Sequence, residues 1–373
     1  DGIFHMQPNG EIDYQINNYN GLSNNTVQSI FEDIENNIWL GLNNGINCLN
    51  TEAPLSIYNE ENGKIGTVHA SCVYNENIYL GTNQGLFFRP LNSNSEFNFV
   101  EGTQGQVWSL VVFENTLFCG HNKGTFIVDN NVQLIPDAQG TWNIIPVQNN
   151  AQNLLLQGNY DGLYILEKKN NSWVLRNKIN GFDISSKFFE MPNDSTVLVS
   201  HEYKGVFRVD VDKDLTKAKL VTKDLTIQKG LTSSLIRYND NVIYANKNGV
   251  YKYWDDSMRF ERDTLLSQLV DSTGYNSSKL VHNKKTNTLW SFSPNSMSFI
   301  APSALSSELK LTKVSLSEAL PKGLTGYENI SHLSEDRFLI GAASGYVIID
   351  FSKYKEKSSE VNINTITISD QDD

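Results

Sequence analysis

The fold is decided by residues 21–50, which read GLSNNTVQSIFEDIENNIWLGLNNGINCLN. This stretch and the residues just after it predict four short strands, at 26–31, 37–42, 46–49 and 55–58. The turn Asn43-Asn44-Gly45 is of the Asn-Gly type, which is typical of a tight hairpin because these residues tolerate positive φ angles. Four antiparallel strands within about 40 residues are typical of one β-propeller blade.

The same hairpin recurs along the chain. Each copy has a glycine where its third strand begins: Gly45, Gly85, Gly124, Gly162, Gly205, Gly249 and Gly345. The first six glycines are 38 to 44 residues apart, and the last gap holds two units. The unit inside that gap, 289–302, has Ser296 in place of the glycine. We therefore predict an all-β fold, a β-propeller of four-stranded antiparallel blades, seven or eight in number, with eight favoured by the count of units.

The repeat also suggests domain boundaries. Residues 1–17 are expected to form a half-blade, either as closing strands of the ring or as the end of an upstream blade. Residues 18–358 are the expected propeller, and residues 359–373 a linker with the first strand of a truncated following domain. Because the chain begins with Asp1 in the middle of a blade, we expect it to be a piece of a longer protein.

Composition narrows the classes of function. The net charge of −12 argues against a nucleic-acid-binding surface, which needs clustered Lys and Arg. The sequence shows no apolar run long enough to cross a membrane, and we expect no signal peptide within it. The cysteines Cys48, Cys72 and Cys119 fall in strands of three different blades, so we expect small core residues. Their spacing contains no CxxC pair, and we expect neither a metal site nor a cofactor.

The quoted stretch resembles the regulator-propeller repeat, the two-component regulator propeller of Bacteroidetes sensors. The matching elements are Gly21-Leu22-Ser23, Glu32-Asp33, Trp39-Leu40-Gly41 and Gly45-Ile46. The second unit keeps Tyr79-Leu80-Gly81-Thr82 and Gly85-Leu86, and later units match less well. Over its whole length the chain is similar to the second half of the propeller region in flavobacterial regulators.

This resemblance implies an extracytoplasmic sensor, periplasmic and without enzymatic activity of its own, often tied to polysaccharide use. In such proteins a three-Tyr (Y_Y_Y) immunoglobulin-like domain follows the propeller, which fits the strand predicted at 361–368. A transmembrane helix and a histidine kinase or helix-turn-helix output domain come next. The expected partners are a small-molecule or oligosaccharide ligand and these missing domains of the same chain, with a homodimer of the full-length protein kept open.

A ligand is expected on the face that carries the second-to-third-strand loops. Three successive blades there have larger side chains than turn chemistry needs, and two tryptophans lead into their inner strands. The candidate ligand-binding residues are Trp108, His121, Trp142, Tyr160, His201, Tyr203 and Lys204. Aromatic faces can stack on sugar rings, and amide or charged donors can bind hydroxyls. The tryptophans could instead pack between blades and the histidines could be surface residues, whereas Trp39 and Trp290 are expected in the core.

Two other function classes stay open. A propeller glycosidase needs two facing carboxylates, for which Asp161 and Glu202 on neighbouring loops are available. A polysaccharide lyase needs a base such as His201 or Tyr203. A protein-protein interaction scaffold is the third class, and the fold alone does not choose among them. Since nothing in the sequence marks a catalytic pair, we assign no catalytic residues and favour the sensor.

Overall fold

The computed structural model describes residues 2–18, 21–50, 53–58, 64–93, 95–129, 131–147, 153–270, 277–294, 296–303, 308–315 and 323–354. Its elements are β-strands and two short 3-10 helices, Leu266–Leu269 (η2) and Phe351–Lys353 (η3). The predicted all-β class is confirmed. Over these ranges the structure contains no helix long and apolar enough to span a membrane.

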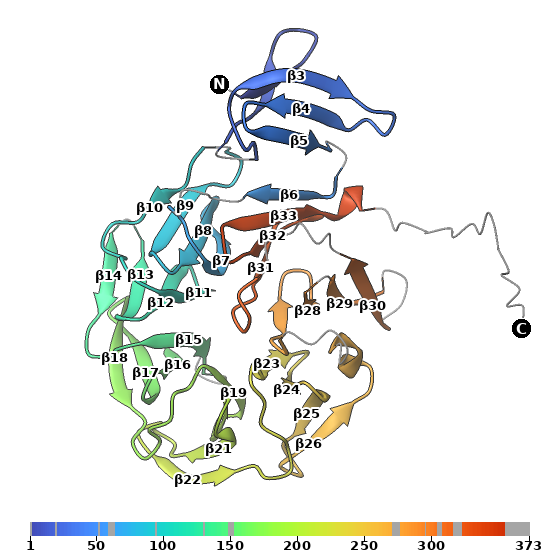
Figure 1. The fold of residues 1–373 in the computed structure, drawn as a ribbon. Coiled ribbons are helices and arrows are strands. Elements are labelled where there is room, and N and C mark those ends of the chain that lie inside the picture. The colour runs from blue at the N-terminus through green and yellow to red at the C-terminus, as the bar shows by residue number, and fades with distance from the viewer. Residues whose placement is uncertain are drawn as a thin grey trace, which may run out of the picture.

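Seven four-stranded antiparallel sheets are arranged around one axis (Figure 1). Their inner strands are neighbours in the order β7, β11, β15, β19, β23, β27, β31 and back to β7. Six sheets are continuous in sequence: Val68–Tyr74 (β7), Asn77–Thr82 (β8), Leu86–Pro90 (β9) and Asn98–Phe99 (β10); Val107–Phe113 (β11), Thr116–His121 (β12), Gly124–Val128 (β13) and Val132–Ile135 (β14); Thr141–Pro146 (β15), Leu154–Asn159 (β16), Gly162–Lys169 (β17) and Ser172–Lys178 (β18); Phe188–Asn193 (β19), Thr196–His201 (β20), Gly205–Val211 (β21) and Ala218–Lys223 (β22); Ser234–Tyr238 (β23), Asn241–Asn246 (β24), Gly249–Trp254 (β25) and Arg259–Asp263 (β26); Val281–Asn283 (β27), Thr288–Ser293 (β28), Ser296–Pro302 (β29) and Leu309–Ser315 (β30).

The seventh sheet joins distant parts of the chain. It contains Ile330–Ser334 (β31), Arg337–Gly341 (β32), Tyr346–Asp350 (β33) and Leu55–Tyr58 (β6). β6 pairs antiparallel with β33 over its whole length. The expectation that residues 55–58 complete the first blade is therefore wrong, because this strand closes the ring. The stacked rings of Tyr58 and Tyr346 are 4.7 Å apart, and the guanidinium of Arg89 lies 6.0 Å from the Tyr58 ring.

The first repeat lies outside the ring. Val27–Glu32 (β3), Ile38–Leu42 (β4) and Gly45–Leu49 (β5) form a three-stranded sheet, and Ile3–Met6 (β1) pairs with Ile12–Ile16 (β2) in a hairpin (Figure 1). The eight predicted units thus correspond to seven four-stranded sheets and one three-stranded sheet among the described residues.

The side chains of the three-stranded sheet β3–β5 are more exposed than the equivalent side chains of the ring sheets. Ile46, which follows the repeat glycine, is 71% exposed. The residues that follow the corresponding glycines in the ring, or Ser296 in the unit that lacks the glycine, are at most 3% exposed: Leu86, Thr125, Leu163, Val206, Val250, Met297 and Tyr346. Each ring sheet packs between two neighbours, whereas no second sheet of the described chain covers this side of β3–β5. For the same reason Trp39, expected in the core, is 42% exposed, and Cys48 opposite it is also exposed, against expectation.

The turns differ from the prediction in one respect. Gly45 has φ +148°, but Asn43 and Asn44 do not adopt positive φ angles, so the turn before the third strand is not the expected type. Paired positive φ angles occur instead between first and second strands, for example 45° at Asn75 and 58° at Glu76. Such pairs are typical of a type I′ turn, whose twist matches that of the flanking strands.

Asp33 explains the acidic turn of the first repeat. Its carboxylate accepts hydrogen bonds from Trp39 Nε1 at 2.8 Å and from the backbone N–H groups of Glu35 and Asn37 at 2.9 Å each. The Trp39 hydrogen bond and those from Asn37 lower the pKa of Asp33 to about 2. Because the folded pKa is below the ordinary value of 3.8, the carboxylate stabilises this sheet above about pH 4, and the effect is lost as the pH falls through 2.

We predict that Asp33→Asn removes this acid sensitivity. In the wild type, hydrogen-exchange protection of β3 and β4 should fall between pH 4 and 2, whereas in the variant it should be lower at pH 6 and nearly constant with pH. Glu32→Gln, which leaves these hydrogen bonds in place, is the control and should behave as the wild type. Equal protection of wild type and variant at pH 6 would contradict the role of Asp33.

Candidate functional site

Side chains from one position of the repeat gather at one end of the ring. His69, Trp108 and Trp142 are the second residues of β7, β11 and β15, and each lies where the strand register shifts. A β-bulge of this kind re-aims the side chain of its extra residue. By strand register, Lys187 and Glu328 hold the same position before β19 and β31. One repeat position therefore supplies five side chains to this end of the ring.

The aromatic members contact one another across several sheets. The Trp108 ring lies 5.0 Å from Trp142, 5.2 Å from His69 and 5.5 Å from Tyr327, measured between centroids. Tyr160, in the turn after β16, lies 4.9 Å from Trp142. We call these five residues the axial aromatic cluster. The structure thus brings together Trp108, Trp142 and Tyr160, three of the predicted residues, and adds His69 and Tyr327.

Lys187 places the cluster at the axis. It precedes β19, while Tyr327 precedes β31, and at least two inner strands separate β19 from β31 in either direction around the ring. The Lys187 ammonium nevertheless lies 3.6 Å from the centroid of the Tyr327 ring and 5.7 Å from that of Trp142. A contact between opposite sides of the ring is feasible only near its centre. Lys187 also donates a hydrogen bond to Gly326 O at 3.1 Å.

Four of the five cluster residues are partly exposed, whereas His69 is buried, and both indole N–H groups are hydrogen-bonded. Trp108 Nε1 donates to Tyr160 Oη at 2.7 Å, and Trp142 Nε1 donates to Ser185 Oγ at 2.9 Å. Trp108 and Trp142 are half-buried and Tyr160 is exposed. His69 Nδ1 donates to Val107 O at 2.9 Å, and burial lowers the pKa of His69, which favours the neutral ring. These contacts hold the rings in fixed orientations with apolar faces available for stacking.

Charged groups adjoin the cluster. Glu328 is 3% exposed, and its Oε2 accepts hydrogen bonds from Gly326 N at 2.9 Å and Ser277 Oγ at 3.2 Å. Its Oε1 is buried and has no hydrogen-bond partner within the described ranges. Burial raises the pKa of Glu328 and lowers the pKa values of Lys187 and Lys279 to about 8 each. The site therefore combines aromatic faces, two lysines and one buried carboxyl group.

The two candidate histidines support turns. His121 is fully buried, and its Nδ1 accepts a hydrogen bond from the N–H of Lys123 at 3.0 Å. His201 Nδ1 accepts from the N–H groups of Tyr203 and Lys204, at 3.2 and 3.3 Å. Both histidines end a second strand, where Thr82 Oγ1 caps the corresponding turn at 3.0 Å. Their expected surface position is wrong for His121, which instead stabilises the turn from inside.

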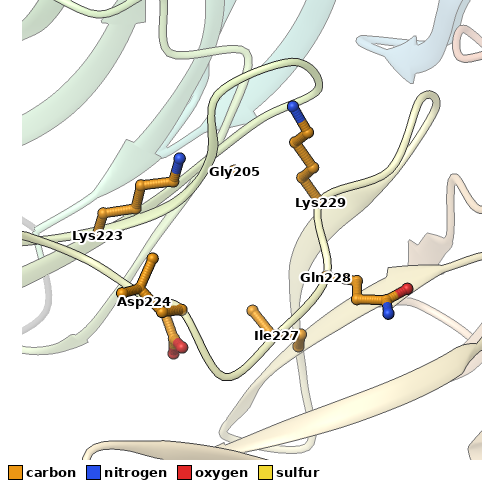
Figure 2. A pocket seen from close by; sticks show the side chains of 7 residues that line it. Gly205, Lys223, Asp224, Ile227, Gln228 and Lys229 are labelled. Atoms are coloured by element: carbon orange, nitrogen blue, oxygen red, sulfur yellow. The ribbon is translucent and has the colours of Figure 1, made fainter.

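Tyr203 and Lys204 lie away from the axial aromatic cluster. Both are exposed, and Tyr203 O accepts a hydrogen bond from Lys229 Nζ at 2.8 Å. A surface pocket of about 370 Å³ adjoins them, in which Lys223 and Lys229 come from facing segments (Figure 2). Its lining residues are Gly205, Lys223, Asp224, Leu225, Ile227, Gln228 and Lys229. The predicted residues thus divide into an axial group and a peripheral group.

One of the two carboxylates considered for glycoside hydrolysis, Asp161, is already engaged. Asp161 Oδ2 accepts hydrogen bonds from Lys178 Nζ and from Tyr164 Oη, both at 2.9 Å. A carboxylate paired in this way is poorly suited to act as a general acid. Across the described ranges no three His, Cys, Asp or Glu side chains are grouped so that they could hold a metal ion.

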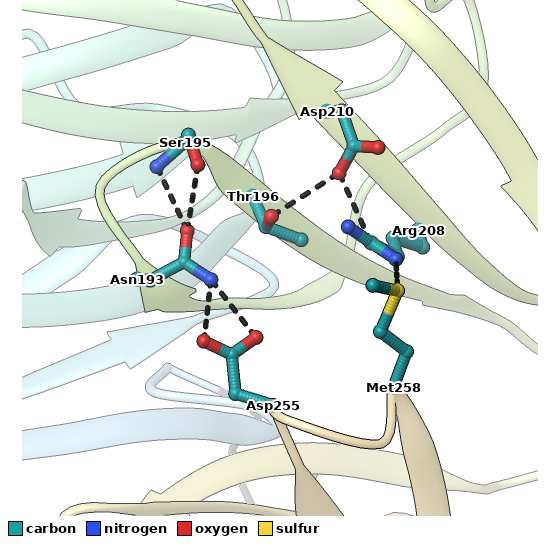
Figure 3. Close-up of polar contacts among 7 residues, drawn as sticks. All are labelled: Asn193, Ser195, Thr196, Arg208, Asp210, Asp255 and Met258. Atoms are coloured by element: carbon teal, nitrogen blue, oxygen red, sulfur yellow. Dashed lines mark hydrogen bonds and ion pairs between the residues drawn. The ribbon is translucent and has the colours of Figure 1, made fainter.

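The opposite ends of the inner strands carry polar contacts between neighbouring sheets. There, polar contacts join the sheet of β19–β22 to that of β23–β26 (Figure 3). Asn193 Nδ2 donates to both carboxylate oxygens of Asp255, at 2.9 and 2.7 Å, and Arg208 contacts Met258. Arg208 Nε also pairs with Asp210 Oδ1 at 3.0 Å. These contacts fix neighbouring sheets and leave the opposite end, with its aromatic rings, as the candidate site.

The first repeat, from which the fold is predicted, is also the part of the chain that matches a protein family. Residues 21–44 match the family model described as Two component regulator propeller. The resemblance to regulator propellers is thereby confirmed. The match lies on β3 and β4, outside the ring, and no curated protein matches the chain.

Solved structures share the fold. Two are extracellular domains from B. thetaiotaomicron, one of a hybrid two component system and one of a one component system. Each has a TM-score of 0.57 and 14% identity, and the alignments cover 94% and 96% of this chain and 51% and 50% of theirs. This chain therefore spans about half the length of these extracellular domains. Virginiamycin B lyase from Staphylococcus aureus has a TM-score of 0.54 and 9% identity, with 79% of this chain and 98% of that chain covered. Likenesses at such identities show the propeller fold alone.

Sequence reasoning missed His69, Lys187, Tyr327 and Glu328. Three of them occupy the same repeat position as Trp108 and Trp142, which was the available signal. The distance from this position to the repeat glycine varies from 16 residues for Trp108 to 20 for Trp142, because the turns vary in length. The equivalence therefore emerges from strand register and not from a fixed spacing.

Proposed function

We propose that this chain is the extracytoplasmic ligand-sensing propeller of a signal-transducing regulator, and that an oligosaccharide binds at the axial aromatic cluster. The observation that carries the proposal is the meeting of Trp108, Trp142 and Tyr327 at the axis, with partly open ring faces. The regulator-propeller match at residues 21–44 supports the sensing role. So do the similar extracellular domains of two-component and one-component systems, which also favour a periplasmic location.

Signalling requires that the ligand bind two arrangements of the protein with different affinity. We propose that the joint at residues 352–361 moves, between the propeller and a following three-Tyr domain that leads to a kinase or helix-turn-helix output. The start of this joint is anchored: Phe351 of η3 packs on Trp290, with centroids 5.8 Å apart. Residues 355–361, like the predicted strand at 361–368, lie outside the described residues. An unchanged orientation of the following domain on ligand binding would contradict this mechanism.

The proposal is tested by thermal shift against a panel of oligosaccharides, with mono- and disaccharides as controls. A ligand that binds only the native state raises the melting temperature by mass action. We predict that one glycan family stabilises the wild type and that Trp108→Ala weakens its binding by about 2 kcal/mol, or roughly 30-fold, since an aromatic stacking surface is lost. Tyr203→Ala removes an exposed aromatic residue outside the cluster and should bind as the wild type does.

Three outcomes would count against the proposal. Loss of binding in Tyr203→Ala but not in Trp108→Ala would place the site on the periphery. Release of shortened products from the stabilising glycan would indicate a lyase or glycosidase. Absence of any glycan-dependent shift, together with capture of one protein partner by the cluster, would favour the interaction scaffold.

A further inference from the structure

We infer that the ligand of the axial site is an anionic saccharide whose carboxylate pairs with Lys187. This inference rests on the proposed function, since it names the class of ligand for the same site. Lys187 reaches across the ring to Tyr327, and its ammonium is 3.6 Å from the Tyr327 centroid and 5.2 Å from that of the adjacent Phe188. A ligand stacked on the rings would meet this ammonium directly.

The ammonium of Lys187 can donate further hydrogen bonds. Of its three donors, one is used by Gly326 O at 3.1 Å. Within the part of the chain that the structure describes, neither Lys187 nor Lys279 forms an ion pair with a carboxylate, although ion pairs occur elsewhere on the surface. A half-buried ammonium without an anion is costly, and an anion delivered by a ligand offsets that cost.

Glu328 is a buried charged group beside the cluster. Its Oε1 is buried without a hydrogen-bond donor among the described residues, and a buried acceptor in that state is unfavourable. An acidic sugar matches two features of the site: its C–H face stacks on the rings and its carboxylate pairs with Lys187. The reduced pKa of Lys187, caused by burial, agrees with a cation that lacks its counter-ion.

Glu202 and Glu328 also act on Lys187 electrostatically and favour its charged form. The Oε2 atom of Glu328 accepts hydrogen bonds from Gly326 N and Ser277 Oγ, and Glu202 is a half-buried residue in the turn after β20. Neither carboxylate is within ion-pair distance of Lys187. They weaken but do not cancel the attraction for a ligand carboxylate that contacts the ammonium directly.

The test uses matched acidic and neutral probes on the full chain. The acidic set contains oligogalacturonate, oligoalginate and hyaluronan oligosaccharides, and the neutral set contains methyl-esterified oligogalacturonate, xylo-oligosaccharides and manno-oligosaccharides. We expect binding of at least one acidic probe, with affinity that falls as salt rises, and a loss of roughly 10- to 100-fold in Lys187→Met, as expected for a hydrogen bond to a charged group. Lys187→Arg should recover part of the affinity. Lys204→Met, an exposed lysine outside the cluster, should leave it unchanged.

The outcomes separate this inference from the proposed function. Binding of neutral glycans alone, or equal binding of oligogalacturonate and its methyl ester, would overturn the anionic ligand and leave a glycan sensor. Acidic binding that is insensitive to both salt and Lys187→Met would also overturn it. If Lys187→Met fails to fold, the salt dependence and the ester comparison on the wild type decide. No binding of either set would overturn the proposed function, and this inference with it.

Discussion

A chain that begins at residue 51 is expected to fold with nearly the melting temperature of the whole, whereas a chain that begins at residue 60 is expected not to form a stable ring. The two differ by β6, which is the outer strand of the closing sheet. Its Tyr58 stacks on Tyr346, and its Leu55 packs beside Ile349 in the neighbouring core. Loss of these contacts costs about 3 to 6 kcal/mol, which is comparable with the total stability of many domains.

The shorter chain should also aggregate. Without β6, strand β33 becomes an edge with unpaired backbone groups, and its apolar Val347 and Ile349 lose their cover. Circular-dichroism melting and gel filtration of the two chains provide the measurement. The chain from residue 51 is the matched control, because it lacks β1–β5 but retains the closing strand. Equal melting temperatures for the two chains would contradict the closing role of β6.

Trp290→Ala is expected to lower the free energy of unfolding by about 3 to 5 kcal/mol, while Trp39→Ala lowers it by no more than about 1 kcal/mol. The two tryptophans occupy the same repeat position, opposite Phe299 and Cys48 in their third strands. Trp290 is 1% exposed and lies between sheets, with ring centroids 4.4 Å from Phe299 and 5.5 Å from Phe338. Its removal leaves a large cavity.

Trp39 serves as the control because its removal opens no enclosed cavity. It is 42% exposed, and its main specific contact is the hydrogen bond to Asp33. Urea unfolding of both variants, monitored by circular dichroism, measures the difference. Similar losses of stability in the two variants would mean that Trp39 is covered in solution and that the exposure of β3–β5 described above is wrong.

The fold class follows from the sequence because the glycine-marked hairpin recurs with a regular period. The pairing of strand Leu55–Tyr58 cannot be predicted from the sequence. A short apolar strand after a hairpin fits the local pattern whether it pairs with β5 or with β33. Only closure of the whole ring decides between them. The same is true of Trp39 and Trp290, whose sequence contexts are alike but whose neighbours in space differ.

The candidate site was predictable in part. Trp108, Trp142 and Tyr160 were selected as large side chains on one face, and the structure brings them together. His121 and His201 look equally unusual in the sequence, yet hydrogen bonds to turn N–H groups account for both. Lys187 and Tyr327 escaped notice because 140 residues separate them in the chain and only the ring places them in contact.

The most direct test of the central claim is a crystal structure of the full chain with the most stabilising oligosaccharide. We predict sugar density at the axis, stacked on Trp108 or Trp142 and within hydrogen-bond distance of Lys187. Density confined to the peripheral pocket beside Lys223 and Lys229, with the axial aromatic cluster unoccupied, would contradict the claim.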